Sequence, residues 1–261
     1  MKIIDAIILG LTQGLTEFLP VSSSGHLSLV GSILGIEPNI TVDLLLHFAT
    51  LISVVIVLWK DIVATLKKPK QMLLLIIASI PACAVGVLCG GLIEQIFGTL
   101  WVLVITFLSS SILLFISDIL ARKKRSLTSI GYKSSIIMGI GQAFAVLPGL
   151  SRSGTTIALG IMSGAKRDEV VKFSFMMSIP IILGGMLVKI IELITGVGNT
   201  VISVHDIVPL VIGSIFACIS GYVAIRVMLN AVTKSNLRVY SIYLAILALF
   251  VFVNVFVTPL W

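Results

Sequence analysis

Charged residues are scarce in this chain, which has 261 residues and only 11% Asp, Glu, Lys and Arg. Soluble domains carry roughly 25% charged residues. Hydrophobic residues make up 58% of the chain, and its mean hydropathy is +1.19. This balance excludes a soluble enzyme, a disordered tail and a DNA-binding domain, and it predicts an integral membrane protein.

Cysteine is also scarce, since the chain has only Cys83, Cys89 and Cys218. Their spacing fits no metal site, and an odd number of cysteines does not form a complete set of disulfides. Each cysteine lies in an apolar run. We therefore interpret all three as small residues of the core.

The lengths of the apolar runs predict an all-α membrane protein with six transmembrane helices and two re-entrant helical hairpins. A hydrocarbon core about 30 Å thick needs about 20 helical residues to cross it. The runs of sufficient length are 43–59, 72–92, 98–119, 172–195, 207–229 and 240–258. Regions 3–36 and 134–164 each hold two shorter apolar pieces around a break rich in Pro, Gly and Ser. Irregular backbone at membrane depth needs protein or water partners, so both breaks are predicted to line one cavity.

The basic residues, 18 against 11 acidic ones, indicate which loops face the cytoplasm. They gather in the stretches 60–70, 122–133, 166–172 and 226–238. The stretches 37–42, 93–97 and 196–206 contain no Lys or Arg and are predicted to lie outside. Region 134–164 is flanked by basic clusters and is predicted to enter the membrane from the cytoplasm, whereas region 3–36 is predicted to enter from outside.

An internal repeat agrees with this topology. Residues 10–13 recur as 139–142, and residues 19–26 recur as 147–155 with one insertion. The copies have opposite predicted orientations, which is typical of inverted-topology repeats with a site near the membrane midplane. We predict one membrane domain over 1–261, with halves at approximately 1–125 and 130–261.

Polar residues in the two breaks predict an anion site. Ionisable residues inside a membrane are costly and by default mark function. Those in or beside the breaks are Glu17, His26 and Arg152, with His47 as a further candidate. Hydroxyl residues stand where a new helix should begin in each break: Ser22, Ser23 and Ser24 in the first, and Ser151, Ser153, Thr155 and Thr156 in the second. Two helix N-termini would then face one anion, and Arg152 adds a planar charge suited to phosphate oxygens.

Ser23 and His26 are candidates for covalent chemistry. If Ser23 lies in the first turn of its helix, His26 shares its face. A hydroxyl beside an imidazole, with Glu17 available to take a proton, is the arrangement of an activated nucleophile. Either Ser23 attacks the substrate, or His26 attacks and Ser23 binds phosphate. The alternative is a purely structural role, in which the serines serve helix packing and His26 is a core histidine.

The remaining ionisable residues in or near apolar segments are given structural roles. We interpret His47 and His205 as interfacial groups, and Lys189 with Glu192 as a local ion pair one helical turn apart.

Residues 13–26 and 148–156 resemble the two signature motifs of the undecaprenyl-diphosphate phosphatase family, also called the bacitracin-resistance proteins. The first segment is similar to a Glu/Gln-x-x-x-Glu element followed by a Ser/His segment. The second is similar to a Pro-Gly-x-Ser-Arg-Ser-x-x-Thr element. Chain length and span number also agree, so the resemblance covers essentially the whole chain.

The resemblance implies removal of the terminal phosphate from undecaprenyl diphosphate on the outer side of the bacterial plasma membrane. This reaction recycles the lipid carrier of cell-wall synthesis and confers resistance to bacitracin. We expect catalytic roles for Glu17, Ser23, His26 and Arg152. Substrate-binding roles are expected for Gln13, Ser22, Ser24, Ser151, Ser153 and Thr156.

The resemblance also implies a divalent cation, Mg²⁺ or Ca²⁺. Many family members have Glu at the position of Gln13. The amide offers an oxygen but cannot be a second carboxylate, so a metal would depend on Glu17 and the substrate phosphates. The expected partners are the polyprenyl diphosphate and membrane lipids, without nucleic acid; the oligomeric state is left open.

A transporter or flippase for a phosphate-bearing lipid or anion is the competing hypothesis, because carriers share the inverted-repeat architecture. Transport needs positive charge and N–H donors but no activated hydroxyl. The pair Ser23 and His26 therefore discriminates between the two hypotheses.

Overall fold

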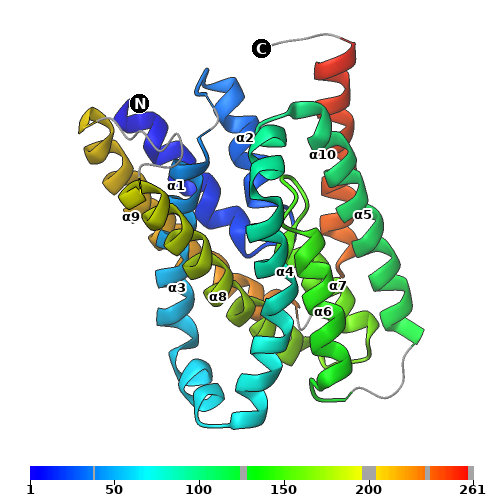
Figure 1. Ribbon diagram of the computed structural model, residues 1–261. Coiled ribbons are helices and arrows are strands. Elements are labelled where there is room, and N and C mark those ends of the chain that lie inside the picture. Colours follow the sequence, from blue (N-terminus) through cyan, green and yellow to red (C-terminus); the bar gives the residue numbers. More distant parts are fainter. Residues whose placement is uncertain (38, 124–127, 196–203, 233–235, 258–261) are drawn as a thin grey trace.

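A computed structural model describes the chain except residues 38, 124–127, 196–203, 233–235 and 258–261 (Figure 1). Every named element of the described residues is helical, which confirms the predicted all-α fold. The elements are α1 (Ile3–Glu17), α2 (Ser23–Ile33), α3 (Ile40–Leu66), α4 (Pro69–Ile96), α5 (Leu100–Lys123), α6 (Tyr132–Phe144), α7 (Arg152–Met162), α8 (Arg167–Thr195), the 3₁₀ turn η1 (Val204–Asp206), α9 (Ile207–Val232) and α10 (Arg238–Phe256).

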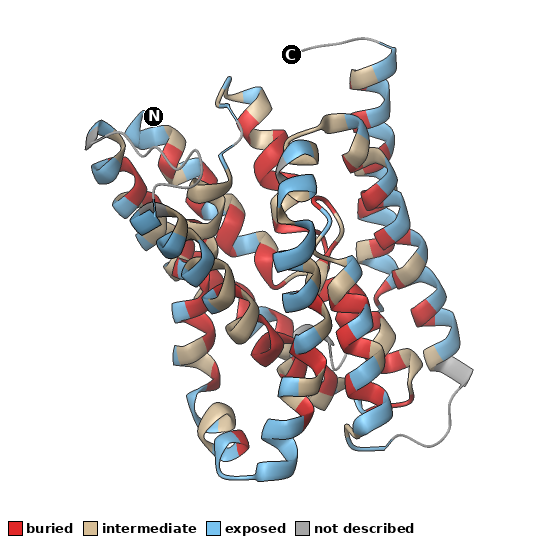
Figure 2. Cartoon of the chain, in the orientation of Figure 1, coloured by how far each residue is buried: buried red, intermediate tan, exposed pale blue. Residues whose placement is uncertain are grey.

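Six of the described helices are long and apolar enough to cross a membrane, namely α3, α4, α5, α8, α9 and α10. Each of them overlaps one of the six predicted runs, with different end residues. Their outward faces carry large apolar side chains, such as Leu88, which is 82% exposed. Figure 2 shows exposed residues along the outer faces of these helices and buried residues between them. An apolar exterior of this extent identifies a multi-pass membrane protein.

The remaining four helices form two short pairs, α1 with α2 and α6 with α7, each joined by a break. The helix–break–helix pattern of both regions is therefore confirmed. Their re-entrant course and the inverted repeat stay predictions. The first helix of each pair packs on a long helix from the other half of the chain: α1 lies against α9, and α6 lies against α4.

Glycine makes these two contacts close. A Cβ added at Gly10 would collide with the backbone of Gly213, and one added at Gly139 would collide with the backbone of Ala78. Gly10 and Gly139 are equivalent in the sequence repeat. Small residues that let helix backbones approach are typical of helix packing in membranes.

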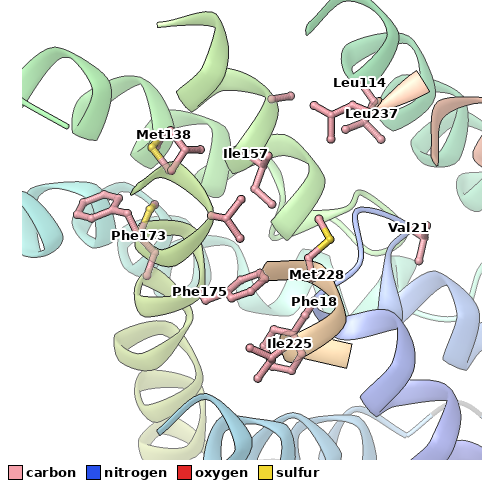
Figure 3. Packing of buried hydrophobic residues seen from close by; sticks show 14 of the residues in the cluster. Phe18, Val21, Leu114, Met138, Ile157, Phe173, Phe175, Ile225, Met228 and Leu237 are labelled. Atoms are coloured by element: carbon pink, nitrogen blue, oxygen red, sulfur yellow. The ribbon is translucent and has the colours of Figure 1, made fainter. Parts of the chain in front are cut away.

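Buried apolar side chains from several helices form one core cluster, which includes Phe18 and Val21 beside the first break (Figure 3). Phe18, the first residue after α1, is fully buried. Its ring packs edge-on against Phe175 of α8, with 5.2 Å between the ring centroids. Ile225 and Met228 of α9 belong to the same buried cluster. These contacts fix the C-terminal end of α1, whose last residue is Glu17.

The interpretation of the cysteines as core residues is wrong for Cys83 and Cys89, which are exposed, whereas Cys218 is partly buried. The outer face of α4 is apolar, and a small, weakly polar thiol suits a face that needs no packing partner. The predicted ion pair between Lys189 and Glu192 is confirmed, at 2.7 Å. His205 lies in η1 and is exposed.

Candidate active site

Serine side chains cap the two helices that follow the breaks, as the sequence predicts. Ser22 Oγ accepts a hydrogen bond from the backbone N–H of Gly25 at 3.3 Å, and α2 begins at Ser23. Ser151 Oγ accepts from the N–H of Gly154 at 3.0 Å, and α7 begins at Arg152. Each serine thereby satisfies one of the unpaired N–H groups of a first helical turn.

The two breaks contact each other. Ser153 Oγ donates to the backbone oxygen of Leu19 at 2.8 Å, and the N–H of Gly149 donates to Ser24 Oγ at 3.2 Å. Gly149 has a φ of +84°, a conformation that suits glycine. The two break regions are therefore in contact, as a shared cavity would require, and the cavity itself stays a prediction.

Glu17 lies at this meeting point and is only 5% exposed. The guanidinium of Arg152 donates to its Oε1. Ser23 Oγ donates to Oε2 at 2.5 Å, and Gln13 Nε2 donates to the same oxygen at 3.0 Å. Three of the four predicted catalytic residues, Glu17, Ser23 and Arg152, are thus in direct contact.

The interpretation of His47 as an interfacial group is wrong, because His47 lies in the site. His47 Nε2 lies 3.1 Å from Glu17 Oε2. On the other side of the ring, Nδ1 lies 2.8 Å from the backbone oxygen of Asp43 and 3.5 Å from its carboxylate. The signal that could have found His47 is its spacing from Asp43: two ionisable residues one turn apart share a face of an otherwise apolar spanning helix.

His26 has a different environment from the one predicted. Its Nδ1 donates to the backbone oxygen of Ser22 at 2.7 Å, and its Nε2 lies 2.6 Å from the hydroxyl of Tyr243. The two rings are nearly parallel, with 5.7 Å between centroids. Both nitrogens of His26 are therefore engaged with groups other than Ser23. Sequence reasoning missed Tyr243, which lies 217 positions away on α10 and carries no local signal.

The guanidinium of Arg152 also contacts α8. Its Nη1 donates to the backbone oxygen of Ser174 at 3.4 Å. Thr156 Oγ1 donates to the backbone oxygen of Arg152 at 2.9 Å and lies 2.6 Å from the hydroxyl of Ser174. Ser174 is a third residue of the site, after His47 and Tyr243, that could not be identified from the sequence. These bonds fix the first turn of α7, and hence the base of the arginine side chain.

The protein donors do not fit a resident metal ion. Among the described residues, no group of three or more His, Cys, Asp or Glu side chains is placed to hold a metal. Both oxygens of Glu17 already accept from donors, one of which is the permanently charged Arg152. Gln13 Oε1 is buried and has no partner among the described groups, but one neutral oxygen beside an occupied carboxylate falls short of the oxygen shell of Mg²⁺ or Ca²⁺.

These observations define a class: a multi-pass membrane protein with a buried centre of hydroxyl, carboxylate and guanidinium. The chain matches the family described as Bacitracin resistance protein BacA over residues 6–250, and it belongs to that family. It is 36% identical to the undecaprenyl-diphosphatase of Halothermothrix orenii, in an alignment that covers 97% of this chain and 98% of that protein. It is also 39% identical to the undecaprenyl-diphosphatase of Parabacteroides distasonis, with 95% and 97% covered.

Proposed function

We propose that this protein hydrolyses undecaprenyl diphosphate to undecaprenyl phosphate and inorganic phosphate. One observation carries the proposal beyond family membership: the hydroxyl of Ser23 donates to the Glu17 carboxylate at 2.5 Å, beside the guanidinium of Arg152. A hydroxyl bonded to a base, next to a fixed cation, suits nucleophilic attack on a phosphoryl group.

In the proposed reaction, Ser23 Oγ attacks the terminal phosphorus while Glu17 accepts the hydroxyl proton. The bond from that phosphorus to the bridging oxygen breaks, and undecaprenyl phosphate leaves. Water then attacks the phosphoserine, which releases inorganic phosphate and restores Ser23. Glu17 returns its proton to the leaving Ser23 Oγ, and the proton lost by the attacking water leaves with the inorganic phosphate or to solvent, so the protein is unchanged.

Arg152 binds the phosphate oxygens in this scheme. In the resting structure its guanidinium donates to Glu17, so an incoming diphosphate competes with that carboxylate. The transfer of Arg152 to the substrate frees Glu17 Oε1 and brings positive charge to the group on which negative charge accumulates. The first turns of α2 and α7 add N–H donors at the same place.

We assign the nucleophile to Ser23 rather than His26. The proton acceptor of Ser23, the Glu17 carboxylate, is already hydrogen-bonded to its hydroxyl. By contrast, the two ring nitrogens of His26 are hydrogen-bonded to Ser22 and Tyr243. His26 then serves to bind the diphosphate or to carry a proton. Trapping a phosphorylated enzyme and mapping the modified residue tests this assignment; phosphohistidine at position 26 would contradict it.

The substrate and its surroundings follow from the same proposal. The prenyl chain stays in the hydrocarbon phase, which explains an apolar exterior on an enzyme of water-dependent chemistry. We propose that the site opens to the outer side of the bacterial plasma membrane and that the basic loops are cytoplasmic, because of the distribution of Lys and Arg. A divalent cation would be held mainly by the phosphate oxygens, since the protein donors do not fit a resident ion, and it would supply positive charge to the diphosphate.

The test is phosphate release from undecaprenyl diphosphate by the protein purified in detergent. Ser23→Ala should reduce turnover to the level left by positioning and charge alone, a loss of several orders of magnitude. Normal turnover in Ser23→Ala would overturn the site assignment. The transporter hypothesis is not favoured, because transport has no use for the bond between Ser23 and Glu17; lipid flux into liposomes without phosphate release would revive it.

A further inference from the structure

Glu17 is held at its two oxygens by side chains from different parts of the chain. Oε1 accepts from Arg152, which the proposed reaction assigns to the substrate. Oε2 is in contact with Ser23, Gln13 and His47. When Arg152 turns to the phosphate, only the contacts at Oε2 remain to keep the carboxylate in place.

The His47 ring is oriented by its own helix. The backbone oxygen of Asp43 accepts hydrogen bonds and donates none, so Nδ1, at 2.8 Å from it, carries a hydrogen. The Asp43 carboxylate lies 3.5 Å from the same nitrogen. A second partner that fixes one nitrogen of an imidazole sets the direction of the other. Here the other nitrogen, Nε2, is directed at Glu17.

The helix that carries His47 is itself anchored away from the two breaks. Ser53 Oγ donates to the backbone oxygen of Cys218 on α9 at 2.6 Å. Lys172 of α8 donates to Asp61 at 2.8 Å. α3 is thus tied to two other long helices by contacts that do not involve α7.

We propose that His47, oriented by Asp43, is a positioning residue that keeps the Glu17 carboxylate turned toward Ser23 during the reaction, an inference that rests on the proposed phosphatase function. His47 acts through Glu17, whose Oε2 it contacts, and takes no part in the proton transfer itself. Without it, a buried carboxylate that has given up Arg152 keeps Gln13 as its remaining fixed donor, and it loses its alignment with the hydroxyl.

The kinetic test compares His47→Leu with the control His205→Gln, which alters an exposed histidine in η1. We expect kcat of His47→Leu to fall about 10- to 100-fold, the usual effect of removing a group that orients a functional residue. KM should stay close to the wild-type value, because His47 does not bind the diphosphate. His205→Gln should match the wild type.

Rescue separates positioning from a merely structural role. His47→Gln places an amide N–H within reach of Glu17 and should recover most of the lost kcat, whereas a packing role would favour the apolar Leu variant. Equal kcat for His47→Leu and the wild type overturns the proposal. So does a His47→Gln variant that is folded and as slow as His47→Leu.

A spectroscopic arm is independent of turnover. The chain has only three histidines, so ¹⁵N-histidine labelling gives few ring signals, and the variants at positions 47 and 205 assign them. Glu17→Gln should shift the ring signals of His47 and leave those of His205 unchanged. If the wild type releases no phosphate, the proposed function fails on that result alone. The shift at His47 then supports its contact with Glu17, and an unshifted signal overturns it.

Discussion

Arg152, at the start of α7, bonds to the carboxylate of Glu17, at the end of α1, across 135 positions of sequence. The side chain of Arg152 is 16% exposed and that of Glu17 is 3% exposed. A buried carboxylate needs a partner, since an uncompensated charge costs about 3–5 kcal/mol. In the resting state the Glu17 carboxylate is therefore paired with the Arg152 guanidinium, which the proposed substrate would bind.

Arg152→Lys tests the planar geometry of that cation. Lysine keeps the positive charge beside Glu17, so the protein should fold, but it lacks the two-pronged donor set that matches phosphate. We expect kcat/KM to fall about 10- to 100-fold, as when one of two parallel charged hydrogen bonds, each worth about 1.5–3 kcal/mol, is lost. Phosphate release in detergent measures the effect.

The matched control for this change is Arg226→Lys. Arg226 is exposed and its guanidinium stacks on the ring of Tyr222, 4.9 Å from the centroid. The Arg226→Lys change should leave kcat/KM unchanged. If Arg152→Lys is as active as this control, the guanidinium of Arg152 does not bind the diphosphate.

Gly149→Ala tests the geometry of the second break. The φ of +84° costs a residue with a Cβ about 1–2 kcal/mol. The added Cβ would also meet the side chains of Thr106 and Leu103. We expect a clear loss of thermal stability in detergent and a loss of phosphatase activity. Gly86→Ala on α4 is the control, because the structure shows no neighbouring atom within 4 Å of the added Cβ. An equal melting temperature for both variants would contradict the strain argument.

Metal binding tests the mismatch between the site and a resident ion. The substrate-free protein should take up no tightly bound Mn²⁺, as measured by electron paramagnetic resonance, and chelator should leave its melting temperature unchanged. Mn²⁺ added together with an unreactive diphosphate analogue should bind at the site, because the phosphate oxygens complete the shell. Stoichiometric Mn²⁺ without the analogue would show that Glu17 and Gln13 suffice.

The six spanning helices and the two helix breaks could be predicted because they depend on local properties of the sequence. Run length alone identifies a spanning helix, and serine at a break is a local capping signal. The closeness of Glu17 and Arg152 could also be predicted, since both residues lie in or beside the two breaks, which are predicted to line one cavity. These predictions needed no knowledge of how the long helices pack.

The contributions of the long helices could not be predicted. His47, Ser174 and Tyr243 each reach the site from the N-terminal third of a long apolar helix. The direction in which a helix face points depends on packing with its neighbours. His26 shows the same limit. Its spacing from Ser23 suggests a shared face, but Ser22 has a φ of +69°, and its carbonyl takes the imidazole Nδ1. Strained residues of this kind are characteristic of functional sites.

Tyr243→Phe tests the state of His26 without altering its ring contact. Nδ1 of His26 donates to the Ser22 carbonyl, so in a neutral imidazole Nε2 is left to accept from the Tyr243 hydroxyl. Phenylalanine keeps the stacked ring but removes that donor. We expect the ¹⁵N signal of His26 Nε2 to move toward that of an unbonded nitrogen, with a loss of about 1 kcal/mol of stability. Tyr222→Phe on α9 is the control and should leave the His26 signals in place. An unchanged His26 spectrum in Tyr243→Phe would mean that the hydroxyl does not donate to the imidazole, and Nε2 would then be free to take a proton from Ser23 or to attack phosphorus itself.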